Sequence, residues 1–177
     1  MHGIIHKSLK GYVEAELPDE SWDEVMDAAG IEPKLYLPVS HYPDEEVTAI
    51  VEALAERTDH TEETLLVDFG EFLVPELLDT FKAHVRDDWA TIDLLENLRS
   101  IYEDIASNDE TSPPDVDTER VGDDAVAIVY QSELELCALG KGIIRGIAAT
   151  YDETATIEED ACQLDGDDRC ELTVTVE

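Results

Sequence analysis

The chain is organised around the stretch DWATIDLLENLRSIYEDI, residues 88–105. Apolar residues recur there at three- and four-residue steps, which gives one apolar face and one acidic face: Ile92, Leu94, Leu95, Leu98, Ile101, Tyr102 and Ile105. This spacing predicts a single core helix with Asp87 or Asp88 as its N-cap. At about 100° per residue, Arg99 lies at the edge of the apolar arc, so a charged side chain stands beside a face that packs inward.

Length and charge restrict the class of protein. The 177 residues are enough for one domain with a proper core. Because 45 acidic residues against 11 basic ones give a net charge of −34, binding to nucleic acid is disfavoured. The acids are spread along the whole chain, which indicates a halophilic protein working in molar salt, where charges are screened over a few ångströms. An acidic mesophilic protein is the alternative.

No apolar run is long enough to span a membrane, and the N-terminus has no basic segment before a long apolar one. We therefore expect a cytoplasmic protein without membrane contact. The three cysteines are an odd number, which argues against a disulfide framework and leaves metal binding or burial.

The segment before residue 88 carries the pattern of a helical lobe. Apolar spacing and capping residues predict helices over residues 1–17 and 22–29, a third from Pro43 and a fourth from about residue 59 or 61. Pro75 should kink or interrupt the fourth helix.

After residue 106 the pattern changes. A linker is predicted over residues 107–117, around TSPPD. Two β-hairpins flank a glycine-containing helix, as β-branched alternation and the turn residues indicate; the predicted ranges are 119–130 for the first hairpin, 134–149 for the helix and 154–176 for the second hairpin. The glycines of the predicted helix 134–149 should allow another backbone or a flat ligand to come close. The fold class is therefore α+β.

Short segments in a fixed order resemble the H-NOX family, the heme nitric-oxide and oxygen binding domains. They are Met1-His2-Gly3-Ile4-Ile5, Glu20-Ser21-Trp22, Ala28-Ala29-Gly30, Tyr42-Pro43-Asp44, Phe69-Gly70-Glu71-Phe72, Leu95-Glu96-Asn97-Leu98, Tyr130-Gln131-Ser132 and the closing cysteines. The resemblance implies a single domain over residues 1–177. Its distal helical lobe would be 1–85, and its proximal α+β lobe, with a four-stranded antiparallel sheet, 86–177.

The resemblance also places the heme site, and two of its positions differ here. The family ligates heme iron with a histidine just after a segment like Leu95-Glu96-Asn97-Leu98, and that position holds Arg99. A protonated guanidinium has no lone pair for iron. The family's propionate motif Tyr-x-Ser-x-Arg is matched by Tyr130 and Ser132, but Leu134 replaces the arginine.

On the distal side the resemblance implies a pocket that includes Ile5, Leu9 and Leu139. Oxygen-binding members have a tyrosine at the position of Leu139, so stable oxygen binding is not expected. Heme b remains the cofactor that the family implies. An iron ligand could come from elsewhere, such as His84, while Arg99 could also pair with Glu96, Glu103 or an anion.

The cysteines form a second candidate site. Cys162 and Cys170 lie at the ends of paired strands, and Cys137 on the preceding helix can reach them, which suits tetrahedral zinc with Glu159 or water as the fourth ligand. Some bacterial H-NOX proteins are similar, with a histidine where Glu159 stands. Three buried cysteines, or a redox-sensing disulfide between Cys162 and Cys170, are the alternatives.

These features favour a non-catalytic H-NOX-like signalling domain that is degenerate for heme ligation, carries structural zinc and regulates a partner. The resemblance implies a histidine kinase, cyclase or chemotaxis transducer as that partner. The first alternative is a heme-based nitric oxide sensor with an unusual iron ligand. The second is a small-molecule carrier that uses the vacated pocket. No nucleophile or phosphate-loop pattern indicates an enzyme.

Overall fold

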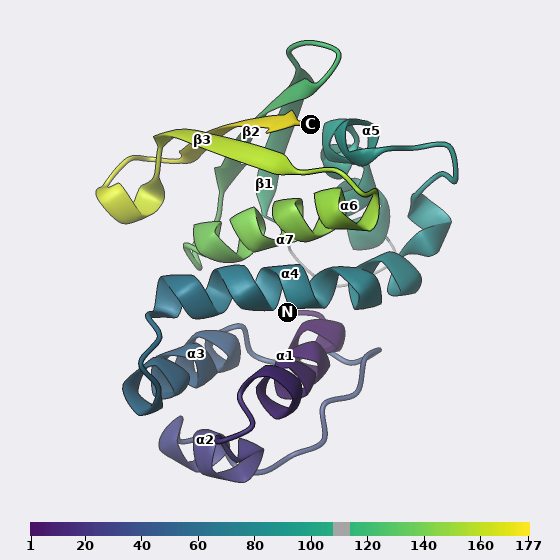
Figure 1. Ribbon diagram of the computed structural model, residues 1–177. Coiled ribbons are helices and arrows are strands. Elements are labelled where there is room, and N and C mark those ends of the chain that lie inside the picture. The colour runs from purple at the N-terminus through teal and green to yellow at the C-terminus, as the bar shows by residue number, and fades with distance from the viewer. Residues whose placement is uncertain (108–113) are drawn as a thin grey trace.

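The computed structural model describes residues 1–107 and 114–177. It has the α+β architecture that the sequence predicted, with a helical lobe stacked on a lobe that contains an antiparallel sheet (Figure 1). Within the described ranges, none of the helices combines the length and the apolar character that crossing a membrane requires.

Four helices build the helical lobe: α1 (Gly3–Glu16), α2 (Trp22–Ala28), α3 (Glu45–Arg57) and α4 (Glu62–Thr80). The Thr61 hydroxyl caps α4 by accepting a hydrogen bond from the Thr64 amide at 3.2 Å. Of the two outcomes predicted at Pro75, an interruption is wrong, since α4 continues to Thr80, and a kink stays a prediction. Leu73 and Val74 beside the proline are fully buried, and their packing outweighs the hydrogen bond that proline cannot make.

The stretch 88–105 is not one helix but two, α5 (Thr91–Glu96) and α6 (Leu98–Ser107). Asn97 lies between them with φ −96° and ψ 5°. Its side-chain amide donates to the Asp93 carbonyl at 2.8 Å, which an unbroken helix would leave to the Asn97 backbone amide. That backbone amide bonds to Leu94 instead, at 3.1 Å. The Asn97 side chain thus takes the Asp93 carbonyl that the Asn97 backbone amide would bond in a continuous helix.

The start of α5 also differs from the prediction. Ala90 is the N-cap residue, and its amide donates to Asp93 Oδ2 at 3.1 Å. Asp88 instead accepts hydrogen bonds from Arg86, with Nε to Oδ1 at 3.0 Å. A short 3-10 helix, Lys82–His84, precedes this region.

The proximal lobe holds the sheet and α7 (Cys137–Thr150). Its strands are β1 (Asp115–Arg120), β2 (Ala125–Gln131), β3 (Ala155–Ala161) and β4 (Cys170–Val176), all antiparallel in the order β1-β2-β4-β3. The linker predicted over 107–117 ends too late, because 115–117 belong to β1; its positions 108–113 lie outside the described residues. A short 3-10 helix, Gln163–Asp165, lies between β3 and β4.

Glycines join the two lobes along the seam between α4 and α7, which lie side by side in Figure 1. A Cβ added to Gly70 would come within 2.8 Å of the Gly142 Cα, and one added to Gly146 within 2.6 Å of Val74 Cγ2. Atoms cannot approach that closely. The prediction that the α7 glycines admit another backbone is therefore confirmed at Gly142.

Candidate ligand cavity and cysteine cluster

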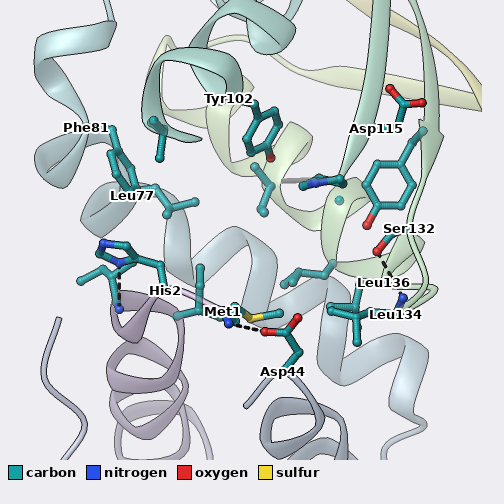
Figure 2. A pocket seen from close by; sticks show the side chains of 18 of the residues that line it. Met1, His2, Asp44, Leu77, Phe81, Tyr102, Asp115, Ser132, Leu134 and Leu136 are labelled. Atoms are coloured by element: carbon teal, nitrogen blue, oxygen red, sulfur yellow. Dashed lines mark hydrogen bonds and ion pairs between the residues drawn. The ribbon is translucent and has the colours of Figure 1, made fainter. Parts of the chain in front are cut away.

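A cavity of about 620 Å³ lies where the two lobes meet (Figure 2). Its volume falls within the range of about 300 to 1,000 Å³ that is typical of small-molecule sites. The apolar part of its wall comes from α1, the end of α4, α6, the segment after β2 and α7; the residues include Ile4, Ile5, Leu77, Phe81, Ile105, Leu134, Leu136, Leu139 and Ile143. The site can therefore hold a largely apolar ligand.

Five of the residues proposed from sequence for the heme site line this cavity: Ile5, Tyr130, Ser132, Leu134 and Leu139. Leu9 does not line it, because its side chain packs without solvent exposure in the core of the helical lobe. His84 does not line it either and lies 3.9 Å from Asp104, Nδ1 to Oδ2.

Arg99 points away from the cavity. Its side chain is 59% exposed, its Nε donates to Glu103 Oε1 at 3.1 Å, and a second ion pair joins it to Asp117 on β1. The hydrogen bond to Glu103 and the charge of Asp117 raise the pKa of Arg99 above its ordinary value. Arg99 is therefore a protonated surface residue that ties α6 to β1.

Tyr102, one turn further along α6, does face the cavity, and Figure 2 shows its hydroxyl directed into it. The sequence prediction used Tyr102 only as a core residue. The signal that could have found it is its spacing with Ile105, since residues three apart lie on one face of a helix. Burial raises the pKa of the Tyr102 hydroxyl above its ordinary value.

The polar edge of the cavity has no arginine among its described residues. The Ser132 hydroxyl accepts from the Leu134 amide at 3.2 Å. The Met1 ammonium forms an ion pair with Asp44, and Asp115 also lines the cavity. Burial raises the pKa of Tyr130, which hydrogen-bonds with Ser132, to about 12. Among the described residues at this edge, the Met1 ammonium faces the two carboxylates of Asp44 and Asp115.

The three cysteines form a buried cluster in the proximal lobe. Cys162 Sγ and Cys170 Sγ lie 3.8 Å apart, and Cys137 Sγ is 2.6 Å from Cys170 Sγ. Two thiolates on one tetrahedral zinc ion, with Zn–S bonds of about 2.3 Å, lie about 3.8 Å apart. Cys162 and Cys170 match that spacing, and Cys137 would have to turn away slightly. Burial raises the pKa of the Cys137 and Cys162 thiols.

Glu159, the proposed fourth ligand, belongs to a different arrangement. Its Oε2 accepts from Lys141 Nζ at 2.7 Å. A ligand atom of Glu159 lies within 4.8 Å of those of Cys162 and Asp165, but it is not grouped with Cys137 and Cys170. The structure brings the three thiols together and leaves Glu159 at the edge of the cluster.

The sequence profile of the haem-NO-binding family matches residues 2–159. The chain belongs to the H-NOX family. No curated protein matches it. It resembles an H-NOX protein from S. oneidensis in the Fe(II)NO ligation state, with a TM-score of 0.91 and 23% identity, over 100% of this chain and 99% of the other.

Two further H-NOX structures show the same fold at lower identity. One is an Fe(II) unliganded H-NOX variant from K. algicida, with a TM-score of 0.84 and 17% identity, covering 100% of this chain and 97% of that one. The other is a variant from T. tengcongensis, with a TM-score of 0.85 and 19% identity, covering 100% and 98%. At these identities the structural likeness establishes the fold.

The H-NOX family implies a heme. The cavity fits the heme macrocycle, but it lacks the histidine and the arginine with which the family holds the iron and the propionates. The volume and apolar walls suit a flat apolar ring, and Tyr102 directs an oxygen donor into the space. Histidine ligation from position 99 does not fit, because that position holds an exposed arginine. The arginine clamp for propionates does not fit either, since Leu134 lines the cavity in its place.

Proposed function

We propose that this protein is a non-catalytic H-NOX sensor domain that has lost histidine-ligated heme chemistry, keeps a ligand cavity between its lobes and controls a signalling partner. The observation that carries the proposal is Arg99, which is exposed and paired with Glu103 and Asp117. A guanidinium held protonated by two carboxylates cannot donate a lone pair to iron. Heme, if bound in the cavity, would supply an iron atom that can bind a small gas molecule.

We also propose a structural zinc ion at Cys137, Cys162 and Cys170. Three converging buried sulfurs are a soft donor set of the kind that zinc prefers. Glu159, Asp165 or water would complete the tetrahedron, and both carboxylates lie close to Cys162. Because zinc binds thiolates, its binding would release the protons that burial otherwise keeps on Cys137 and Cys162.

The two sites share one residue, which supports a sensor rather than a passive carrier. Tyr130 lines the cavity and also packs against the cysteine cluster. It is the partner of Cys170 in the pairing of β2 with β4. A ligand that shifts Tyr130 would therefore move the sheet surface beside α7. A partner such as a histidine kinase, cyclase or chemotaxis transducer could respond to that change.

The net charge of −34 supports a salt-adapted cytoplasmic protein. Experiments on this domain therefore belong in molar salt, which screens the repulsion between its carboxylates.

A heme-based sensor with an unusual iron ligand is the second candidate function. Tyr102, with its hydroxyl in the cavity, favours it. A small-molecule carrier is the third, and the retained cavity of about 620 Å³ supports it.

The test is an absorption spectrum with iron and zinc analysis of the full chain purified in molar salt, before and after addition of hemin and nitric oxide. We expect zinc near one per chain and no histidine-type ferrous heme that shifts with nitric oxide. A stoichiometric ferrous heme that gives such a shift would contradict the loss of histidine ligation.

A further inference from the structure

We propose that Tyr102 is the residue through which this domain binds heme iron, as an axial phenolate on ferric heme. The inference rests on the proposed function, because it takes the cavity between the lobes as the ligand site. In this inference the ligand of the domain is ferric heme itself, rather than a gas that binds to ferrous heme.

Tyr102 and Ile105, and not Arg99, form the side of α6 that faces the cavity. Residues advance by about 100° each along a helix, so the direction midway between Tyr102 and Ile105 lies about 90° from Arg99. Both Tyr102 and Ile105 line the cavity, whereas Arg99 is held on the outside by Asp117 of β1. Arg99 therefore lies on the outer side of α6, and Tyr102 lies on the side that faces the cavity.

The Tyr102 hydroxyl is available as a ligand. Among residues 1–107 and 114–177 no hydrogen bond to this hydroxyl is found. Burial is the one cause that raises its pKa. The other oxygen donor of this type, Tyr130, already hydrogen-bonds with Ser132. His2 also lines the cavity, but its Nδ1 accepts from the Ile4 amide at 3.4 Å, and its ring packs edge-on against Phe81.

Tyrosine is an established type of axial heme ligand. As a hard anionic oxygen it suits ferric rather than ferrous iron. On binding, the O–H bond of Tyr102 breaks, its electron pair is donated to the iron, and the proton leaves to solvent. No electron is transferred. The phenolate offsets the excess positive charge of the ferric porphyrin core, and that cation in turn stabilises a phenolate that burial alone would disfavour.

The test compares hemin binding by the wild type and by Tyr102→Phe, using the full chain in molar salt. We expect the wild type to bind one hemin with a phenolate-to-iron charge-transfer band and tyrosinate modes in resonance Raman spectra. Tyr102→Phe should lose both signatures. It should also weaken hemin binding by at least about tenfold, because removal of even an outer-shell partner of a metal ligand costs that much.

Two further variants make the result specific. Tyr12→Phe is the control, because Tyr12 packs against Phe69 and Phe72 in the helical core, outside the cavity; it should keep the wild-type spectrum. Tyr102→His should replace the tyrosinate signature with a histidine-type spectrum and give a ferrous form that binds nitric oxide.

The possible outcomes separate this inference from the proposed function. Loss of the tyrosinate signature only in Tyr102→Phe supports the inference. Identical hemin spectra in wild type and Tyr102→Phe overturn it, as does transfer of the effect to Tyr130→Phe. Absence of hemin binding by the wild type also overturns it. In these three cases the loss of histidine ligation stands. A ferrous, nitric oxide-responsive heme in both wild type and Tyr102→Phe would overturn the inference and the proposed function together.

Discussion

The cysteine cluster and the cavity share Tyr130, yet they are built in different ways. The three buried sulfurs come from the first residue of β4, the residue directly after β3 and the first residue of α7. The cavity wall comes from both lobes, the N-terminus and a helix that is broken at Asn97. The cluster therefore has its geometry fixed by regular structure. The cavity depends on a few side chains that set the rotation of α6.

This difference predicts that zinc changes the structure of the cysteine cluster little, whereas a ligand in the cavity changes the position of α6. Zinc would enter a preformed set of donors, so binding should stabilise the whole proximal lobe. A ligand in the cavity would instead act through α6, which is held to β1 by the exposed ion pair of Arg99 with Asp117. Exposed ion pairs contribute little free energy, so α6 is the more adjustable wall.

The largest effect is expected from Cys170→Ala, which should abolish zinc binding. In the zinc-loaded protein we expect the free energy of unfolding to fall by more than about 3 kcal/mol, because zinc binding is coupled to folding. Thermal unfolding with and without a chelator measures this. After chelation the variant should differ from wild type by only about 1 kcal/mol. An equal difference before and after chelation would mean that the cysteines only fill space.

Position 99 offers the next comparison. Arg99→His alone should not give stoichiometric histidine-ligated heme, because residue 99 faces solvent. Asn97→Ala removes the side chain that takes the Asp93 carbonyl, so it should favour a continuous helix and change the rotation of α6. The double variant should therefore bind hemin as a histidine-type ferrous heme after reduction, as absorption spectra would show.

The matched control is Asn97→Ala alone, which should bind no histidine-ligated heme. If Arg99→His gives a full histidine-type spectrum without the second change, the break at Asn97 does not control the orientation of α6.

The same contrast explains which features the sequence could predict. Alternation placed Cys170, Leu172 and Val174 on one buried face of β4, and the structure confirms this. Glycine content predicted the close approach at Gly142. These features follow from regular periodicity, which is a local property of the sequence.

The orientation of Arg99 and Tyr102 could not be predicted in the same way. Periodicity treats residues 88–105 as one helix, but a single side-chain hydrogen bond from Asn97 interrupts it. The pairing of Arg99 with Asp117 joins segments that are distant in the sequence. Both depend on competition between local and tertiary contacts, which a pattern along the chain does not show.

A substitution at the polar edge of the cavity can restore the arginine of the family's propionate motif. Leu134→Arg should strengthen hemin binding by about tenfold, since a charge-assisted hydrogen bond contributes roughly 1.5 kcal/mol or more. Glu133→Gln is the control, because it makes the same change in net charge on the adjacent exposed residue. Hemin titrations in molar salt should separate the two. Equal gains would show that overall charge, rather than the clamp position, limits affinity.

The smallest effect is expected at the edge of the cysteine cluster. Glu159 is held by Lys141 at 2.7 Å and is not grouped with Cys137 and Cys170. Glu159 lies outside the group of three sulfurs and its carboxylate is already engaged by Lys141, so Glu159→Ala should lower zinc affinity by less than about fivefold. Competition with a zinc chelator measures this. A loss of zinc affinity as large as that of Cys170→Ala would instead make Glu159 a zinc ligand. Its carboxylate would then have to leave Lys141 when zinc binds. The cysteine cluster would in that case rearrange on binding, as the cavity does.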